Sequence, residues 1–400
     1  MSSSRAQNAA DDSARSNDSA DARSVQTAFR YLTTGELDGM AATDVLRQSL
    51  TIRSVISTAS TYAKRAQRSQ DQSLLTEIKE IGEGLQGAIF EQLGSSQAMK
   101  KEKLGNEKLP FNLNHEYRIH AAVEAAFDRF NLLVDCQVYI PQLVHFKEKQ
   151  ENQPYWDNCL QQFPAGHRRP GDMITMEKIL PMPKVVREAI IKEFYPVANN
   201  QPPDSTTIQK VLGLPSNKNS LIRTYFGKED IKLSPDSFTL RNFPLCWKPM
   251  ERVGLDVDTL VAEVGKAYAL MHWGAGVNGD DVEFVLGSYI IPSEAGAAST
   301  PDSQHRAIGL FLLDFGQCSF IDLAEDFHVV YQVFRGAMVT GDNQNFIPNL
   351  RKTPALFAIF KNAYINAGQK ILSEKHLETR FDIDEFMQLY EEYAEDFLLY

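Results

Sequence analysis

Residues 271–288 read MHWGAGVNGDDVEFVLGS, and residues 311–318 read FLLDFGQC. The apolar run VEFVL predicts a buried strand, and FLLDFG predicts a second strand that ends in a turn. Asp281 and Glu283 then belong to the first strand, and Asp314 stands at the end of the second. Because a buried carboxylate is costly to desolvate without a cation, carboxylates at strand ends indicate a functional site.

Upstream motifs occur in the order that protein kinases use. Gly82, Gly84 and Gly87 form a Gly-x-Gly-x-x-Gly pattern before a predicted strand, and the backbone amides of such a loop can approach phosphates. Lys100 follows on a predicted second strand, and Glu116 lies on a predicted helix. Glycine loop, strand lysine and helix glutamate are the successive parts of a kinase small lobe.

The tripeptide at 314–316, Asp-Phe-Gly, resembles the metal-binding tripeptide of kinases, in which Asp314 would hold a divalent cation. Each feature also has a plain alternative. The glycines are compatible with an ordinary hairpin, Lys100 stands beside Lys101 and Lys103 in what reads equally as a solvated basic run, and an Asp often caps a strand-end turn. Because the glycine loop, the lysine, the glutamate and the Asp-Phe-Gly tripeptide follow one another in the kinase order, the sequence predicts an α+β, protein-kinase-like bilobal fold. Its N-lobe would be small and strand-rich, and its C-lobe larger and helical.

The expected catalytic loop departs from the kinase pattern. Kinases place an Asp two residues after the His, and the residue two after His272 is Gly274. Aligning VEFVL with the strand after that loop puts Asp281 in the metal-ligand Asn position and Asn278 near the position of the base. Since an amide cannot accept a hydroxyl proton, the sequence predicts a kinase-like fold that lacks the usual base.

The acidic pair offers a different chemistry. On an extended strand, Asp281 and Glu283 would point to the same face about 6–7 Å apart. Two carboxylates at that spacing repel each other unless a cation lies between them, and a guanidinium fits them through two parallel hydrogen bonds. The alternatives are an edge strand with solvated acids and, for His272, a histidine at a helix end stabilised by the helix dipole.

Composition limits the class of protein. Of the 400 residues 43% are apolar, which supports a sizeable core, and the net charge of −11 argues against a chain coated for nucleic-acid binding. The four cysteines lie far apart, without the spacing of a zinc site or any need for a disulfide. With no apolar leader or membrane span in view, we expect a cytoplasmic protein with neither membrane nor DNA as a partner.

The chain divides by composition into five parts. Residues 1–24 are too polar to offset the entropy of ordering and are predicted to be a disordered tail. A helical period predicts a helical N-terminal extension over 25–73. The strand-rich N-lobe is predicted over 74–195, a Pro- and Asn-rich linker loop over 196–219, and the helical C-lobe with the acidic loop over 220–400.

Basic residues gather in three places. If these lined one groove they would guide an RNA acceptor stem through its phosphates, although surface charge is the plain alternative for each. The groups are the stretch 167–169, the set Lys184, Arg187 and Lys192, and the set Lys100, Lys101 and Lys103.

Five stretches of sequence stand out: MITMEKILP (173–181), LIRTYFGK (221–228), FTLRNFPL (238–245), MHW (271–273) with DVEFVLG (281–287), and LLDFGQC (312–318). Together they resemble one fungal family, long labelled a zinc-finger protein of unknown function, over roughly residues 80–345. The zinc label finds no support in the residues. The family's usual loop reads D-x-N-D-V-E-F, whereas here Asn278 replaces the first acid and Asp280 replaces the Asn.

As we know it, this family includes the arginine-containing cyclodipeptide synthases of fungal secondary metabolism. The resemblance implies an aminoacyltransferase that condenses arginine with a second amino acid into a cyclo-(Arg-Xaa) diketopiperazine. It also implies arginyl-tRNA and a second aminoacyl-tRNA as substrates, no metal or other cofactor for the condensation, and downstream tailoring enzymes as partners. Asp280, Asp281 and Glu283 would bind the guanidinium or the reacting amine, and His272 would carry a proton.

Two other functions compete with the synthase. The first is a kinase-like phosphotransferase or nucleotide-binding pseudokinase that uses Lys100, Glu116, Asp281 and Asp314 with ATP and Mg²⁺. The second is an interaction scaffold that has kept the fold and lost the chemistry. A covalent route for the synthase would need a nucleophile such as Ser288 or Cys318, but the sequence places no base beside either.

Overall fold

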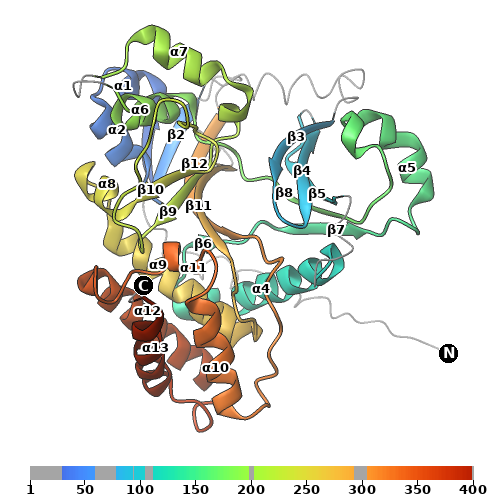
Figure 1. The fold of residues 1–400 in the computed structure, drawn as a ribbon, viewed down its shortest axis with the longest axis vertical. Coiled ribbons are helices and arrows are strands. Elements are labelled where there is room, and N and C mark those ends of the chain that lie inside the picture. The colour runs from blue at the N-terminus through green and yellow to red at the C-terminus, as the bar shows by residue number, and fades with distance from the viewer. Residues whose placement is uncertain are drawn as a thin grey trace, which may run out of the picture.

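The chain folds into two lobes, each built on its own β-sheet (Figure 1). The predicted tail at 1–24 lies outside the described residues. The computed structural model describes residues 29–58, 78–92, 94–103, 111–197, 202–291 and 304–398.

The small lobe is an antiparallel sheet of five strands in the order β3-β4-β5-β8-β7. Phe90, Trp156 and Phe163 form a buried aromatic cluster between this sheet and α5. The elements are β3 (Ile78–Glu83), β4 (Gly87–Gln92), β5 (Gln97–Glu102), β7 (Leu143–Lys147), β8 (Met173–Glu177) and α5 (Gln153–Cys159).

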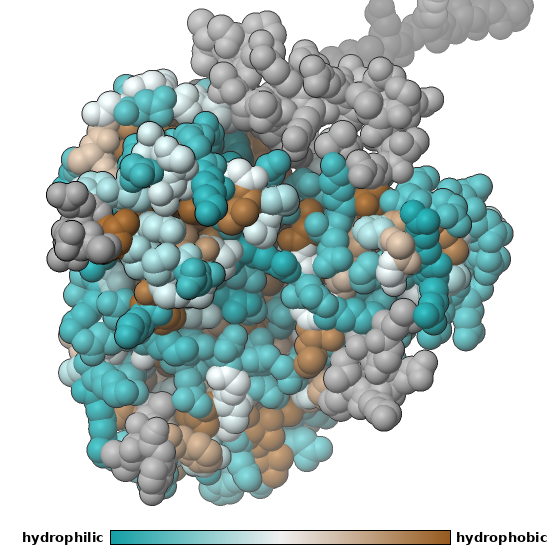
Figure 2. All heavy atoms as spheres, turned by 45° about the horizontal axis from the view of Figure 1, so that its top comes forward, coloured by the Kyte–Doolittle hydropathy of each residue, from teal (hydrophilic) through white to brown (hydrophobic). Residues whose placement is uncertain are grey.

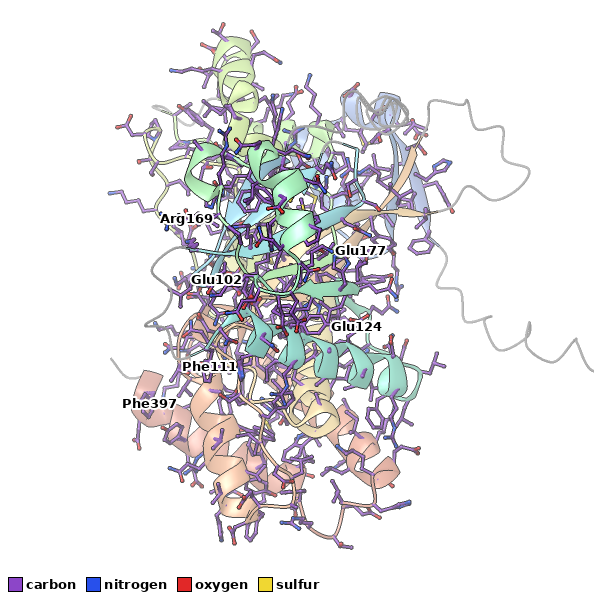
Figure 3. The ribbon with its side chains drawn as sticks, turned by 90° about the vertical axis from the view of Figure 1, so that its right-hand side faces the viewer. Glu102, Phe111, Glu124, Arg169, Glu177 and Phe397 are labelled. Atoms are coloured by element: carbon purple, nitrogen blue, oxygen red, sulfur yellow. The ribbon has the colours of Figure 1, made fainter. Side chains whose placement is uncertain are left out.

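Helix α4 (Leu113–Val134) separates the small lobe from the helices of the large lobe. Asn112 caps it by accepting a hydrogen bond from the amide of His115 at 2.9 Å. Its buried residues recur at helical spacing and include Ile119, Val123 and Phe127. Figure 3 shows α4, which carries Glu124, crossing the molecule between the small lobe and the C-terminal helices.

The large lobe contains a mixed sheet of seven strands in the order β1-β2-β12-β11-β9-β10, with β6 paired to β12. The antiparallel hairpin β11–β12 lies at its centre and sets Glu283 opposite Leu313. The strands are β1 (Arg30–Thr33), β2 (Ser54–Thr58), β6 (Val138–Tyr139), β9 (Ile222–Tyr225), β10 (Phe243–Cys246), β11 (Glu283–Ile291) and β12 (Gln304–Leu313).

Helices lie above and below this sheet in the view of Figure 1. The upper group is α1 (Thr34–Asp38), α2 (Ala42–Ser49), α6 (Lys184–Phe194) and α7 (Ser205–Gly213). In the lower group, α8 and α9 precede β11 in the chain and the other helices follow β12, and α9 packs chiefly against α12. It comprises α8 (Trp247–Arg252), α9 (Val257–Ala269) with a π-helical turn (Leu270–Ala275), α10 (Phe327–Met338), α11 (Asn343–Phe346), α12 (Pro354–Glu374) and α13 (Ile383–Leu398).

The predicted kinase-like bilobal α+β fold is confirmed, with a small strand-rich lobe and a larger lobe that also includes the segment 30–58. The large lobe is nevertheless less helical than predicted for 220–400, because β9 to β12 belong to its sheet. The lobes also divide earlier than predicted. Helix α6 falls in the predicted N-lobe range but packs against α2 of the large lobe, so the connection between the lobes follows β8.

The prediction of a purely helical extension over 25–73 is wrong for the residues described there. Helices α1 and α2 do form, but β1 and β2 flank them and complete the edge of the large sheet. Leu32, Val55 and Ile56 are buried strand residues. A short apolar run fits a strand and a helix equally well, and only pairing with the distant β12 decides between them. Residues 59–73 lie outside the described part.

The predicted linker loop over 196–219 contains a helix, α7. Asp204 caps it by accepting a hydrogen bond from the amide of Thr207 at 2.6 Å. Ile208, Val211 and Leu212 are buried along one side. The Pro- and Asn-rich composition of the flanking residues predicted a loop. The capping Asp204 and the helical spacing of the buried apolar residues instead mark a short amphipathic helix.

The close approach of α9 and α12 depends on a glycine. A Cβ atom at Gly265 would lie 2.5 Å from the carbonyl oxygen of Phe360. We therefore expect Gly265→Ala to lower the free energy of unfolding by about 1–3 kcal/mol through overpacking. Gly336→Ala is the matched control, since nothing lies within 4 Å of a Cβ at Gly336 on α10 and alanine favours a helix. Equal denaturation midpoints for the two variants would contradict the close packing.

The face of the molecule in Figure 2 is mostly hydrophilic, with hydrophobic residues in small scattered patches. Such scattered exposure is ordinary for a folded domain. Within the described ranges, no helix has both the length and the apolar character needed to cross a bilayer.

Candidate functional site

A cavity of about 470 Å³ lies between the two lobes. One part of its wall is apolar and is formed by Ile81, Ile89, Ala98, Met176, Ile179, Leu221, Val285 and Leu313. The other part is charged, and it includes Lys100, Glu116, Arg223, Asp281, Glu283 and Asp314. An apolar wall with a few converging polar groups is the usual form of a small-molecule site.

The structure brings Lys100, Glu116 and Asp314 together from three separate elements. Lys100 on β5 places its Nζ 2.5 Å from Oε1 of Glu116 on α4 and 2.9 Å from Oδ1 of Asp314 after β12. Burial alone would lower the pKa of Lys100, but the charges of Asp314 and Glu116 outweigh it and raise the pKa. Lys100 is therefore a buried cation whose ammonium stays charged.

Asp314 adopts a left-handed backbone conformation, with φ of +66°. Its turn lies against the glycine loop between β3 and β4. A Cβ atom at Gly84 would lie 3.7 Å from Oδ2 of Asp314, and the side-chain amide of Gln86 donates a hydrogen bond to the carbonyl of Gly316. The predicted glycine loop and the Asp-Phe-Gly turn thus face the same end of the cavity. Gly82 lines it too, and Gly87 begins β4.

The sequence predicted Asp281 and Glu283 on the same strand, but in the structure only Glu283 belongs to β11. Asp281 lies in the turn before β11 with φ of +56°, so the alternation of an extended strand does not apply to it. Its Oδ1 accepts a hydrogen bond from the amide of Asp342 at 2.9 Å, and its Oδ2 accepts one from Gln317. Asp281 and Glu283 nevertheless both line the cavity.

Glu283 forms an ion pair with Arg223 of β9, a residue that the sequence analysis missed. The pKa of Glu283 is raised to about 7, chiefly by burial and also by the charges of Asp314 and Asp342, while Arg223 opposes the shift. An arginine inside a short apolar strand is a signal that would have pointed to this pair. Glu283 is therefore a cavity carboxyl that titrates near neutral pH.

The other two predicted catalytic residues lie outside the cavity lining. Asp280 accepts a hydrogen bond from the hydroxyl of Thr340 at 2.9 Å, and burial raises its pKa. His272 is wholly buried, with Nδ1 2.8 Å from the hydroxyl of Tyr364 and its ring stacked on Phe334. Burial lowers the pKa of His272 to about 3. The ring is neutral and structural, which removes it as the expected proton carrier.

The side chains of the remaining candidates for base or nucleophile are buried or engaged in hydrogen bonds within the fold. The side-chain oxygen of Asn278 accepts hydrogen bonds from the amides of Ser319 and Asp280, at 2.8 and 3.3 Å. Ser288 is buried and donates to the carbonyl of Pro181, while burial raises the pKa of the Cys318 thiol well above its usual range. All four cysteines are buried and free. A covalent route through Ser288 or Cys318 gains no support from this geometry.

The basic groups do not line one groove. The stretch 167–169 belongs to the small lobe, where His167 lies 3.3 Å from Glu80, whereas α6 carries its basic residues on the large lobe (Figure 1). Arg187 is tied to the carbonyl of Asn217 at 3.0 Å. Lys100 and Lys101 are buried. The expected phosphate-guiding path for RNA is therefore not assembled by these residues.

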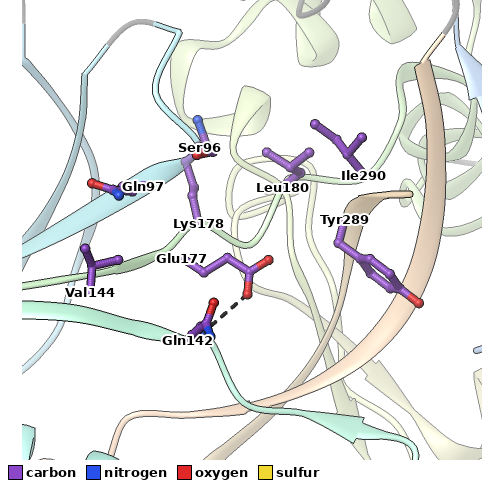
Figure 4. A pocket seen from close by; sticks show the side chains of 9 residues that line it. All are labelled: Ser96, Gln97, Gln142, Val144, Glu177, Lys178, Leu180, Tyr289 and Ile290. Carbon is purple, nitrogen blue, oxygen red and sulfur yellow. Dashed lines mark hydrogen bonds between the residues drawn. The ribbon is translucent and has the colours of Figure 1, made fainter. Parts of the chain in front are cut away.

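A second cavity, of about 340 Å³, lies on the other side of the segment that connects the lobes (Figure 4). The backbone amide of Gln142 donates to the carboxylate of Glu177 there, at 3.5 Å, and Tyr289 and Ile290 close one side. None of the predicted site residues lines it. We therefore place the candidate site in the larger cavity.

The larger cavity fits a magnesium nucleotide in its donor groups. Mg²⁺ is usually held by one or two carboxylates together with substrate phosphates, and Asp281 and Asp314 supply two carboxylates in one cavity. Among the described residues no group of three or more His, Cys, Asp or Glu forms an all-protein metal cage. The apolar wall is suited to a flat ring, and Lys100 to phosphate oxygens.

No protein-family model matches the chain, and no curated protein matches it. Among solved structures, a point mutant of aminoglycoside 2′-phosphotransferase IIIa in complex with GDP is similar. The match covers 83% of this chain and 96% of that chain, with 11% sequence identity and a TM-score of 0.19. A TM-score this low supports no argument. The kinase-like description rests on the two lobes and on the Lys100 site described above.

Proposed function

We propose that this protein is a kinase-like phosphotransferase whose cavity binds a nucleoside triphosphate with Mg²⁺. The observation that carries the proposal is the position of Lys100, whose ammonium contacts both Glu116 and Asp314 at the end of the cavity beneath the glycine loop. Kinases use such a lysine–glutamate pair to hold phosphate oxygens next to a metal-binding aspartate.

Each wall of the cavity has a part in this proposal. The apolar wall receives the base, and Lys100 with the amides around Gly84 receives the phosphates. Asp314 and Asp281 would hold Mg²⁺, which would neutralise charge on the transferring phosphoryl group. Because phosphoryl transfer depends mainly on positioning and electrostatics, this set supplies most of the required chemistry.

The proton of the acceptor needs a base, and Asn278 cannot provide one. Glu283 is the cavity carboxyl whose pKa, raised by burial to about 7, matches the requirement of a base at neutral pH. We assign it that role in the proposed reaction, with Arg223 holding its carboxylate in place.

Lys100→Met tests the nucleotide site. At an ATP–Mg²⁺ concentration 100 times the dissociation constant, binding should stabilise the wild-type protein by about 2.7 kcal/mol, seen as a rise in Tm. Lys100→Met should lose that rise, because it keeps the side-chain volume and removes the charge. Its Glu116 partner can take up a proton, since burial already raises the pKa of that carboxyl. Lys184→Met, at an exposed position on α6, should keep the rise. A full shift in Lys100→Met would refute the proposal.

A second candidate is the arginine-containing cyclodipeptide synthase, with arginyl-tRNA and a second aminoacyl-tRNA as substrates. The observation that favours it is Glu283, a carboxyl with a pKa near 7 that can take a proton from an α-amine. Mass spectrometry after mixing the protein with arginyl-tRNA and other aminoacyl-tRNAs tests it. A cyclic arginine dipeptide that is lost with ribonuclease would support this function, and absence of product with charged tRNAs would refute it.

A further inference from the structure

Most charged side chains of the cavity already have partners. Lys100 contacts Glu116 and Asp314, and Arg223 contacts Glu283. Arg241 is different: its guanidinium has no hydrogen-bond or ion-pair partner in the part of the chain that the structure describes, although it lines the cavity. An uncommitted guanidinium in a cavity is a ready binding group for an anion.

Two amide side chains accompany Arg241 on the large-lobe wall. Asn219 and Asn242 also line the cavity, are partly exposed, and have no side-chain partner within the described ranges. The three residues come from the segments that lead into β9 and β10. These parallel strands begin side by side, since Phe243 donates its amide to the carbonyl of Leu221 at 2.9 Å. The sheet therefore gathers the three groups in one place.

Arg241 and the glycine loop line the same cavity. The pKa of Glu83 in that loop is lowered chiefly by Lys103, which lies 2.7 Å from it, and also by the charge of Arg241. Arg241 thus lies within electrostatic range of the loop that the proposed function assigns to the nucleotide. A guanidinium with two amides offers several N–H donors to the oxygens of a carboxylate or a phosphate.

We propose that Arg241, Asn242 and Asn219 form a subsite for an anionic group, a carboxylate or a phosphate, on the second substrate. The assignment rests on the proposed function, in which the nucleotide occupies the Lys100 side of the same cavity. It makes an acceptor that carries an anionic group the preferred substrate class, because such a group would accept hydrogen bonds from the free N–H donors of these three side chains.

The test titrates two probes, phenyl phosphate and benzoate, into the full chain saturated with a non-hydrolysable ATP analogue and Mg²⁺. We expect one probe to bind. We also expect Arg241→Ala to weaken it about tenfold or more, as for the loss of a charge-assisted hydrogen bond, and Asn242→Ala to weaken it less. Arg53→Ala, at an exposed position remote from the cavity lining, is the matched control and should bind like wild type. The probe that binds identifies the anion as phosphate or carboxylate.

Three results would overturn the subsite: neither probe binds, Arg241→Ala binds as well as wild type, or the nucleotide analogue expels the probe. The last would place Arg241 in the nucleotide site itself. If the protein does not bind the analogue at all, the proposed function fails. The same titration on nucleotide-free protein then decides the subsite by itself, because dependence on Arg241 is measured without reference to ATP.

Discussion

Replacing Asp314 by Asn is expected to abolish Mg²⁺-dependent nucleotide binding and to lower phosphoryl transfer by about 100- to 1,000-fold. The amide keeps the shape of the side chain but removes the negative charge that would hold the cation. Lys100 keeps its contact with Glu116, so the small lobe should remain folded. Equilibrium dialysis with labelled ATP, with and without Mg²⁺, measures the first effect, and the rate of ATP consumption measures the second.

The control for this variant is Asp236→Asn, which alters an exposed acid outside the cavity. It should bind and turn over ATP like wild type. Nucleotide binding by Asp314→Asn that is as strong and as Mg²⁺-dependent as in wild type would remove Asp314 from the metal site. The assignment of the Asp-Phe-Gly turn would then be wrong.

Glu283→Gln should change how stability depends on pH. Burial raises the folded pKa of Glu283 to about 7, above the value of about 4.3 in an unfolded chain. The folded protein therefore binds this proton more tightly than the unfolded chain does. The resulting stability is present in full below the unfolded pKa and is lost as the pH rises through the folded pKa. From pH 5 to pH 8, wild type should lose roughly 2.5 kcal/mol of unfolding free energy relative to the variant.

Chemical denaturation across that pH range measures the difference. The control is Glu251→Gln, at an exposed position on α8, whose stability should depend on pH as in wild type. The same Glu283→Gln variant should lose transfer activity, since an amide cannot accept the acceptor's proton. Wild-type activity should rise with pH toward a plateau above about pH 7, where the carboxylate form prevails. Parallel pH–stability curves for wild type and Glu283→Gln would contradict the raised pKa.

The parts of the site that the sequence predicted are those that local signals mark. Lys100 and Glu116 sit on elements with clear strand and helix patterns, and Asp314 ends an apolar strand. The pairs β4–β5 and β11–β12 each join consecutive strands, so these elements form from neighbouring stretches of chain. The contact between Lys100 and Asp314, which are 214 residues apart, could be predicted only from the order of the motifs.

The parts that sequence reasoning missed depend on contacts between distant segments. Arg223 reaches Glu283 only because β9 pairs with β11 across the large sheet. His272 keeps its helical position, but the packing of α10 and α12 around it turns a possible proton carrier into a buried neutral ring. The turn that takes Asp281 off the strand is fixed by its contact with Asp342. None of these partners stands near its counterpart in the sequence.

The decisive measurement for the proposed nucleotide site is titration calorimetry of ATP into the full chain in the presence of Mg²⁺. We expect saturable binding at one site per chain that weakens strongly when Mg²⁺ is removed. Absence of binding by a cooperatively folding protein, at ATP concentrations in the millimolar range, would contradict it and leave the aminoacyl-tRNA chemistry as the function to pursue.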